Sequence, residues 1–289
     1  MDSPGCAPVG ETGFERWGDA VPASPVVISV PHAGRDYPLP LRAALRVSLG
    51  AAAALEDRYV DAVAHAARGC ETMLVQRRAR AWIDLNRGED ERDAKVEEGT
   101  PLAVTTSAKV GSGLGLIPRR VAPVGDLWRR RWSDAEVRAR IAIDHRPYHG
   151  ALAEALAAAR RRWGVAVLLD LHSMPPLTGP AKGTHVVLGD RFGRAAGSRF
   201  VARAEAVAAA AGLPVALNTP YAGGHILDRH GRPSAGVHAI QLELDRALYL
   251  DRSLDRPGPG LARTAALVRQ MLAALADEAL AGAVPLAAE

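Results

Sequence analysis

Short apolar runs alternate along the chain with longer segments in which apolar residues recur at helical spacing. The clearest run covers residues 165–171, which are apolar on both faces until Asp170, as is typical of a central strand covered by helices. Further strands are predicted over 26–30, 71–76, 80–85, 185–190, 213–217 and 238–245. Strands that alternate with helices predict an α/β fold with a mostly parallel central sheet.

Helices are predicted over 51–68, 134–162, 193–211 and 258–282. The first of these would carry Glu56 and Asp57. The second would begin with a capping box formed by Ser133 and Glu136, and Pro147 would interrupt or kink it.

The remaining segments lack regular periodicity. Residues 1–24 are expected to form a loose arm in front of a single domain over 25–289, because no repeat or linker divides that region. The long irregular segment 88–126 is either a lid or binding loop, or a floppy insertion. The GSGLG sequence at 111–115 lacks the spacing of a dinucleotide fingerprint and is expected to be a flexible turn.

Composition excludes several protein classes. The 289 residues are 48% apolar and 24% charged, which is ordinary for a globular protein and excludes a disordered tail protein. No stretch approaches the roughly 18 consecutive apolar residues that a membrane span requires, and the first residues do not resemble a signal peptide. We therefore expect a cytoplasmic protein without membrane contact.

The charge and the cysteine content bear on whether the protein binds nucleic acid or holds a metal through cysteines. The net charge of +4 comes mostly from arginine, and the arginine clusters at 129–131 and 160–162 suggest either a nucleic-acid surface or solvated helix faces. Interspersed acidic residues favour the second interpretation, so no nucleic-acid partner is expected. Cys6 and Cys70 share no metal-ligand spacing and are expected to be free thiols.

Two histidines follow predicted strands at the carboxyl edge of the sheet, His32 in SVPHAG and His172 in DLHS. A carboxylate from Glu56 or Asp57 could lie over the same edge. Two histidines and one carboxylate form the ligand set of a catalytic zinc with an open position for water. A single histidine at a strand end is more often structural, so it is the joint placement that favours a metal site. Zinc, iron, cobalt and manganese all suit this ligand set.

Two further acidic residues fit such a site. Glu243, near the end of the last predicted strand, could act as the general base, or it could be an outward-facing carboxylate paired with Arg246. Asp170 could accept a hydrogen bond from a metal-binding histidine.

Asn86 and Arg87 could bind an anionic substrate. The planar guanidinium of arginine suits a carboxylate, and a neighbouring asparagine adds a donor for the same anion. Arg80 and Arg146 could supply further anion contacts. The expected partner is therefore a small anionic molecule, while the oligomeric state is not encoded in any recognisable pattern.

Seven sequence blocks together resemble the N-formylglutamate amidohydrolase family, which is distantly similar to zinc carboxypeptidases. They are SVPHAG, EDRYVD, RAWIDLNR, HRPYHGAL, LLDLHSMP, NTPYAGGHI and QLELDR, in this order, and the resemblance extends from about residue 24 to 280. It implies a three-layer α/β/α fold of the phosphorylase/hydrolase-like kind. It also implies a divalent metal and hydrolysis of an N-formyl amide, a reaction of histidine degradation.

Carried over by position, the resemblance implies that His32 and His172 are metal ligands. It also implies that Asp57 is the carboxylate ligand, with Glu56 as the alternative. The carboxypeptidase pattern of a histidine followed three residues later by a glutamate is not kept, because Arg35 stands there.

The resemblance also assigns further site residues. Asn86 and Arg87 match residues that grip a terminal carboxylate, and Glu243 matches the catalytic glutamate. Arg80, already expected to contact an anion, is the arginine expected to stabilise the oxyanion. The other substrate-binding residues expected are Arg146, Gly223, Gly224 and His225. Family members carry an aromatic residue at the position of His225.

The implied function is hydrolysis of N-formyl-L-glutamate to formate and glutamate, by a metal-activated water with Glu243 as the base. One alternative keeps the site but acts on another N-acyl amino acid or a short peptide, like a metallo-aminoacylase or a carboxypeptidase. The other alternative is a catalytically inactive anion-binding protein.

Overall fold

The computed structural model describes residues 13–100, 107–121 and 124–281. The chain divides into two compact units, each built from several segments. The first unit comprises Met1–Glu15, Pro31–Arg58 and Val75–Ala151. The second unit comprises Arg16–Val30, Tyr59–Leu74 and Leu152–Glu289.

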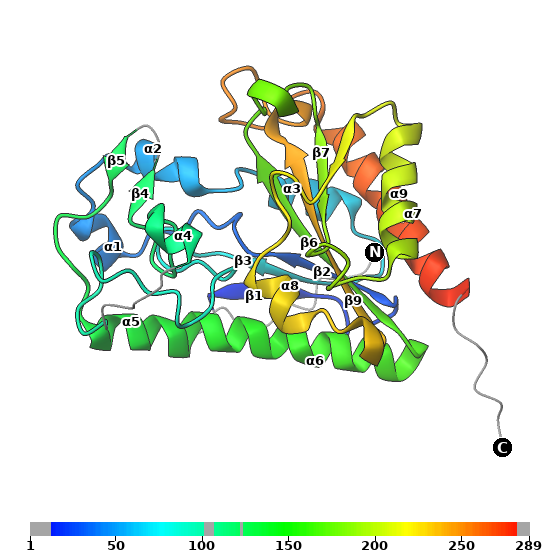
Figure 1. Ribbon diagram of the computed structural model, residues 1–289, viewed down its shortest axis with the longest axis horizontal. Helices are drawn as coiled ribbons and strands as arrows, with labels where there is room; N and C mark the ends of the chain where they lie inside the picture. The colour runs from blue at the N-terminus through cyan, green and yellow to red at the C-terminus, as the bar shows by residue number, and fades with distance from the viewer. Residues whose placement is uncertain (1–12, 101–106, 122–123, 282–289) are drawn as a thin grey trace, which may run out of the picture. The chain divides into compact units, whose positions relative to one another are not determined.

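A seven-stranded sheet forms the core, with strand order β1-β3-β2-β6-β9-β7-β8 (Figure 1). Its strands are β1 (Phe14–Trp17), β2 (Val26–Val30), β3 (Thr72–Gln76), β6 (Ala166–Met174), β7 (Val186–Gly189), β8 (Val215–Leu217) and β9 (Val237–Asp245). The central strands β2, β6 and β9 are parallel, whereas β7 runs antiparallel to β9. The prediction of a mostly parallel sheet is confirmed.

Helices cover this sheet in the three-layer α/β/α arrangement that the sequence predicts. In the second unit, α9 (Leu261–Ala281) packs against both α3 (Val60–Ala67) and α7 (Ser198–Ala210), as Figure 1 shows for α7 and α9. The helix α8 (His225–His230) contacts β9. Every residue of β2, β3, β6 and β7 is buried, which explains why these strands are mostly apolar.

The first unit consists mainly of short elements joined by irregular segments. They are α1 (Leu39–Ala44), α2 (Leu49–Ala52), η1 (Ala53–Leu55), α4 (Ala108–Gly111), β4 (Arg120–Val121), β5 (Gly125–Asp126), α5 (Asp134–Arg140) and the π turn η2 (Ile141–His145). The helix α6 (Arg146–Trp163) begins in this unit and continues into the second one. Three single turns complete the second unit: η3 (Gly179–Ala181), η4 (Pro233–Ala235) and η5 (Arg246–Leu248).

The prediction for the long helix is confirmed in its details. Ser133 and Glu136 form the capping box at the start of α5. The π turn then interrupts the helix two residues before Pro147, near the predicted position.

The predicted helix over 51–68 is wrong in its middle. Glu56 is extended, and Tyr59 has a φ of 54°, so the helix stops after η1 and starts again as α3. Two tertiary hydrogen bonds hold the chain in this shape. The Tyr37 hydroxyl donates to the Glu56 carboxylate, and the backbone N–H of Asp57 donates to the carbonyl of His32. Glu56 and Asp57 therefore lie in a loop, not on a helix.

The predicted strand over 80–85 is also wrong, because these residues form turns. The Trp82 N–H donates to the Ala79 carbonyl, and the Asp84 N–H donates to the carbonyl of Leu116. The Arg80 guanidinium pairs with the Asp84 carboxylate four residues later. These local contacts replace the ladder of hydrogen bonds that a strand would need.

Part of the predicted loose arm is ordered, because Phe14–Trp17 forms the edge strand β1, while residues 1–12 lie outside the described residues. Within 88–126, the described residues contain only α4 and the hairpin of β4 and β5 as regular elements. Cys70 is a free, exposed thiol, and Cys6 lies outside the described residues. No helix in the described part of the chain has the length and apolar character to span a membrane.

Candidate functional site

His32 and Asp57 form a buried pair in the first unit. His32 lies two residues after β2, and Asp57 lies in the loop between η1 and α3. His32 Nδ1 is 3.6 Å from Asp57 Oδ2, and the Asp57 N–H donates to the His32 carbonyl at 2.9 Å. A buried histidine and aspartate held this way could hold a metal ion.

Asp84 fixes the other side of the His32 ring. Its Oδ1 lies 2.7 Å from His32 Nε2, and its Oδ2 accepts from Arg80 Nε at 2.9 Å. Asp84 is fully buried, which by itself would raise the pKa of its carboxyl. The charges of Arg80, His32 and Arg87 outweigh that cost and hold the pKa well below its usual range. The ionised carboxylate can only accept, so His32 Nε2 carries the proton of this hydrogen bond.

Glu56 is occupied by different partners from those of Asp57. Its carboxylate accepts from the Tyr37 hydroxyl and from Arg58 Nη1, the latter at 2.8 Å. Burial raises the pKa of the Glu56 carboxyl, although Tyr37 and Arg58 counteract this effect. Of the two candidate ligands, Asp57 is the one that faces His32.

Asn86 and Arg87 follow Asp84 in the same buried turn. The Asn86 N–H donates to Asp84 Oδ1 at 2.8 Å. Arg87 Nε donates to the Leu114 carbonyl at 2.7 Å and Arg87 Nη1 to the Asn86 carbonyl at 2.6 Å. The guanidinium is therefore held in a fixed orientation by the backbone.

The other two arginines that the sequence singles out have carboxylate partners. Arg80 pairs with Asp84 through both Nε and Nη2. Arg146 is largely exposed and forms a two-pronged ion pair with Glu89, at 3.0 and 2.8 Å. The first unit thus brings Arg80 together with His32 and Arg87 through Asp84, whereas Arg146 lies on the surface.

A row of polar side chains crosses one face of the sheet in the second unit. Asp170 and His172 on β6 are in register with Gln241 and Glu243 on β9, and all four are buried. Side chains two residues apart on a strand share a face, as do partners in register. Asp170 accepts from His172 Nε2 at 2.9 Å and from the Ser29 hydroxyl of β2 at 2.7 Å. This row ends at the carboxyl edge of β6, where His172 lies opposite Glu243.

Glu243 is buried in this row, on the inner side of the sheet edge. Its Oε1 accepts from Gln241 Nε2 at 2.8 Å, while Arg246 Nε donates to the Ser173 hydroxyl. The interpretation of Glu243 as an outward-facing carboxylate is therefore wrong.

Gly223 and Gly224 lead directly into α8, whose first residue is His225. Gly223 has a φ of +99°, and a Cβ there would lie 2.5 Å from the Leu227 side chain. Gly189, at the end of β7, packs against the backbone of 221–223 so closely that a Cβ would meet it at 2.7 Å. Glycine is therefore required at Gly223 and Gly189 to bring this loop to the end of β7.

The donor atoms of both histidines suit a divalent metal. In each ring, Nε2 is hydrogen-bonded to a buried aspartate, Asp84 for His32 and Asp170 for His172, so Nδ1 is the atom that each ring could offer to a metal. A carboxylate behind the ring is the usual partner of a metal-binding histidine, because it fixes the tautomer and orientation. The hydrogen bond that the sequence suggests between Asp170 and a histidine is present, with His172, whereas the sequence reasoning misses the one between Asp84 and His32. The signal was present, because Asp84 stands inside the same DLNR block as Asn86 and Arg87.

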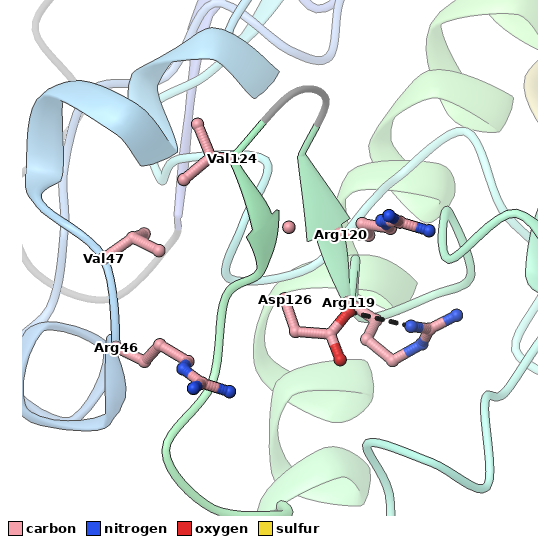
Figure 2. Close-up of a pocket in the computed structure, with 7 residues that line it drawn as sticks. Arg46, Val47, Arg119, Arg120, Val124 and Asp126 are labelled. Atoms are coloured by element: carbon pink, nitrogen blue, oxygen red, sulfur yellow. Dashed lines mark hydrogen bonds and ion pairs between the residues drawn. The ribbon is translucent and has the colours of Figure 1, made fainter.

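A hollow of about 550 Å³ opens elsewhere in the first unit (Figure 2). It is lined by Arg46, Val47, Arg119, Arg120, Val124, Gly125 and Asp126. Arg119 and Asp126 form an ion pair at 2.9 Å, seen as the dashed line in Figure 2. None of the site residues expected from the sequence lines this hollow.

Comparison with known proteins gives consistent results. Residues 24–250 match the N-formylglutamate amidohydrolase family. The chain is 33% identical over 235 residues to the N-formylglutamate deformylase of Pseudomonas aeruginosa, which covers 78% of this chain and 82% of that protein. It is 31% identical over 237 residues to the enzyme of the same name from Pseudomonas putida, over 79% of this chain and 83% of that protein.

Solved structures agree with this result. The crystal structure of N-formylglutamate amidohydrolase from Ralstonia eutropha is similar with a TM-score of 0.80 and 32% identity, over 92% of this chain and 97% of that one. A gene product of Agrobacterium tumefaciens shares the fold, with a TM-score of 0.67 and 21% identity, over 92% of this chain and 96% of that one. The match over most of its length shows that this chain belongs to the N-formylglutamate amidohydrolase family.

Proposed function

We propose that this protein hydrolyses the N-formyl amide of N-formyl-L-glutamate, releasing formate and glutamate, and that the reaction depends on a divalent metal. The observation that carries the proposal is the buried pair of His172 and Glu243, in register on β6 and β9, in a member of this family. The relatives named N-formylglutamate deformylase support the choice of substrate.

We assign the metal ligands to His32, Asp57 and His172. Two observations support the assignment. His32 and Asp57 face each other in the first unit, and each histidine has a buried aspartate at Nε2. His32 lies two residues after β2, and β2 pairs in parallel with β6 up to Ser29 and Asp170, so the chain leaves β2 near the edge of the sheet where His172 stands on β6. Zinc is the expected metal, and iron, cobalt and manganese suit the same ligands.

When bound, such a metal would act as a Lewis acid and would lower the pKa of water toward neutrality. The protein would supply the proton transfers. Glu243 would accept a proton from the attacking water, whose oxygen forms a bond to the formyl carbon. Glu243 would then give that proton to the amide nitrogen as the C–N bond breaks, so that formate and the free amine of glutamate leave. Gln241, which donates to Glu243 Oε1, would hold the carboxylate in place for both transfers.

Substrate recognition would come from Asn86 and Arg87. Buried donors held by the backbone can bind a carboxylate without first becoming ordered, and the arginine fork matches its two oxygens. Arg80 remains our candidate for oxyanion stabilisation. Arg146, Gly223, Gly224 and His225 remain predicted substrate contacts, and a cytoplasmic location remains a prediction.

The test is a substrate panel with purified protein of measured metal content. Formate and free amine are quantified with N-formyl-glutamate, N-acetyl-glutamate, other N-formyl amino acids and a short N-formyl peptide. The proposal predicts that N-formyl-glutamate has the highest kcat/KM and that a chelator abolishes its turnover. Preference for an N-acetyl amino acid or a peptide would support an aminoacylase or peptidase instead. Binding of glutamate without turnover of any substrate would indicate an inactive anion-binding protein.

A further inference from the structure

The turn that carries Asn86 and Arg87 is held by the helical segment of α5, η2 and α6. His145 Nε2 lies 2.8 Å from the Arg87 carbonyl, and His149 Nε2 lies 2.9 Å from the Leu85 carbonyl. A carbonyl oxygen can only accept, so both rings donate. The two hydrogen bonds thus fix the peptide group before Asn86 and the peptide group after Arg87.

The same helical segment also fixes the start of this turn. Arg140 Nη1 donates to the Trp82 carbonyl at 3.0 Å, and the Trp82 indole N–H donates to Asp144 Oδ2 at 2.8 Å. The Arg140 guanidinium is stacked between the rings of Trp82 and Trp132, each centroid 3.8 Å away. Both ends of the segment from Trp82 to Arg87 therefore rest on one helical surface.

The π turn makes this possible. In a regular α-helix, residues five positions apart, such as Arg140 and His145, would point in clearly different directions. A π turn closes its hydrogen bonds five residues apart and so adds one residue to the turn, which brings Arg140 and His145 to nearly the same face. π turns within α-helices are often found at functional sites.

Both histidines are fully buried, and their ring centroids lie 4.4 Å apart. A polar ring in such a place is costly unless it makes a specific hydrogen bond. An apolar residue would fill the same volume and pack against the same neighbours. What the histidines add is an N–H directed at each of two chosen carbonyls.

We infer that His145 and His149 are positioning residues for recognition of a substrate carboxylate, acting through the backbone on either side of the pair formed by Asn86 and Arg87. This inference rests on the proposed function, in which Asn86 and Arg87 bind that carboxylate. The orientation of Arg87 depends on the same backbone, because its Nη1 donates to the Asn86 carbonyl. Loss of either histidine bond would therefore misplace both anion-binding side chains.

The test compares His149→Leu, which lacks the donor, with His149→Gln, whose amide N–H can reach the same carbonyl. For each, kcat and KM are measured with N-formyl-glutamate and with its α-amide and γ-amide analogues. Glutamate affinity is measured by calorimetry. We expect His149→Leu to raise KM roughly 10- to 100-fold while changing kcat much less. We also expect it to reduce the discrimination against one of the two amides, and His149→Gln to restore both properties.

His145→Leu and His145→Gln form the second pair, and His238→Leu is the control. His238 is also buried and accepts from the Gly197 N–H, but it lies near the start of β9, away from the carboxyl edge of the sheet. Its loss should lower stability and leave KM unchanged. All variants are also assayed for metal, and the metal content should stay at the wild-type value.

A folded His149→Leu protein with wild-type KM and amide discrimination would overturn the inference. So would a loss of kcat that His149→Gln fails to restore, or a failure of both leucine variants to fold, since the histidines would then serve the fold alone. If wild-type protein binds glutamate but releases no formate, the proposed function fails. The calorimetric comparison then still decides the role of the histidines.

Discussion

Asp57 is joined to His32 by both its backbone and its side chain. Its N–H donates to the His32 carbonyl at 2.9 Å, and its Oδ2 lies 3.6 Å from His32 Nδ1. The extended backbone at Glu56 sends the preceding carboxylate toward Tyr37 and Arg58 instead. Two adjacent carboxylates thus have separate roles, which mutation can distinguish.

Asp57→Asn should therefore weaken metal binding, whereas Glu56→Gln should not. Loss of an anionic ligand should lower the metal affinity by more than the roughly 10- to 100-fold typical of outer contacts. Affinity is measured by competition with a chromophoric chelator. Glu56→Gln should keep the wild-type affinity and lose stability, because Arg58 is left without its carboxylate partner. The reverse pattern would make Glu56 the ligand.

Asp84→Asn tests the carboxylate behind His32. The amide cannot supply the negative charge that fixes the ring with Nε2 protonated, so metal affinity should fall about 10- to 100-fold. Asp93→Asn is a matched control, because Asp93 is also a buried partner of an arginine, Arg119, at 2.8 Å. Equal losses of metal affinity in both variants would show a general structural effect and contradict the specific role of Asp84.

Arg87→Lys should raise KM for N-formyl-glutamate with a smaller change in kcat. Lysine keeps the charge but loses the fork that binds both oxygens of a carboxylate and the two hydrogen bonds to backbone carbonyls. Arg130→Lys is the control and should keep the wild-type KM, since Arg130 is exposed, paired with Glu136 and not among the expected site residues. Steady-state formate release measures both. An unchanged KM in Arg87→Lys would remove this residue from the substrate site.

His230 should make stability depend on pH. Burial, together with the charges of Arg229, His225 and Arg232, lowers the pKa of His230 from 6.5 to about 3. Between these two values the unfolded chain binds a proton that the folded protein does not. The free energy of unfolding should therefore fall as the pH drops below 6.5, by up to about 1.4 kcal/mol per pH unit from this group.

His230→Phe should remove this contribution, so that its free energy of unfolding changes less than that of wild type between pH 7 and pH 5. Leu39→Gln, at an exposed residue that does not ionise, should follow the wild-type curve. Denaturant unfolding across this pH range measures all three proteins. Parallel curves for His230→Phe and wild type would show that the imidazole is protonated in the folded state.

The sheet, and the places of His172 and Glu243 on it, could be predicted because they depend on the local pattern of apolar residues. A strand buried on both faces is mostly apolar, and the parallel pairing of β6 with β9 then puts His172 beside Glu243. The carboxyl ends of parallel strands all lie at one edge of the sheet, so residues near these ends can be placed from the sequence, whereas the position of a loop residue cannot.

The rest depends on contacts between distant parts of the sequence. RAWIDL alternates like a strand, but Asp84 binds His32 and Arg80, which folds the segment into turns. The alanine-rich segment before Glu56 has the pattern of a continuous helix, but the hydrogen bonds from Tyr37 to Glu56 and from the Asp57 N–H to His32 end it. The π turn that aligns Arg140 with His145 does not change the spacing of apolar residues in a way that a sequence pattern could detect.

The most direct test of the central claim compares wild-type protein with Glu243→Gln, each loaded with one equivalent of zinc, in release of formate from N-formyl-glutamate. Glutamine keeps the shape and the contact with Gln241 but cannot accept a proton. The account predicts formate and glutamate in equal amounts from the wild type, and a kcat lower by about 10² to 10⁴ in the variant with its metal retained. A wild-type protein that releases no formate, or a variant with near wild-type turnover, would contradict it.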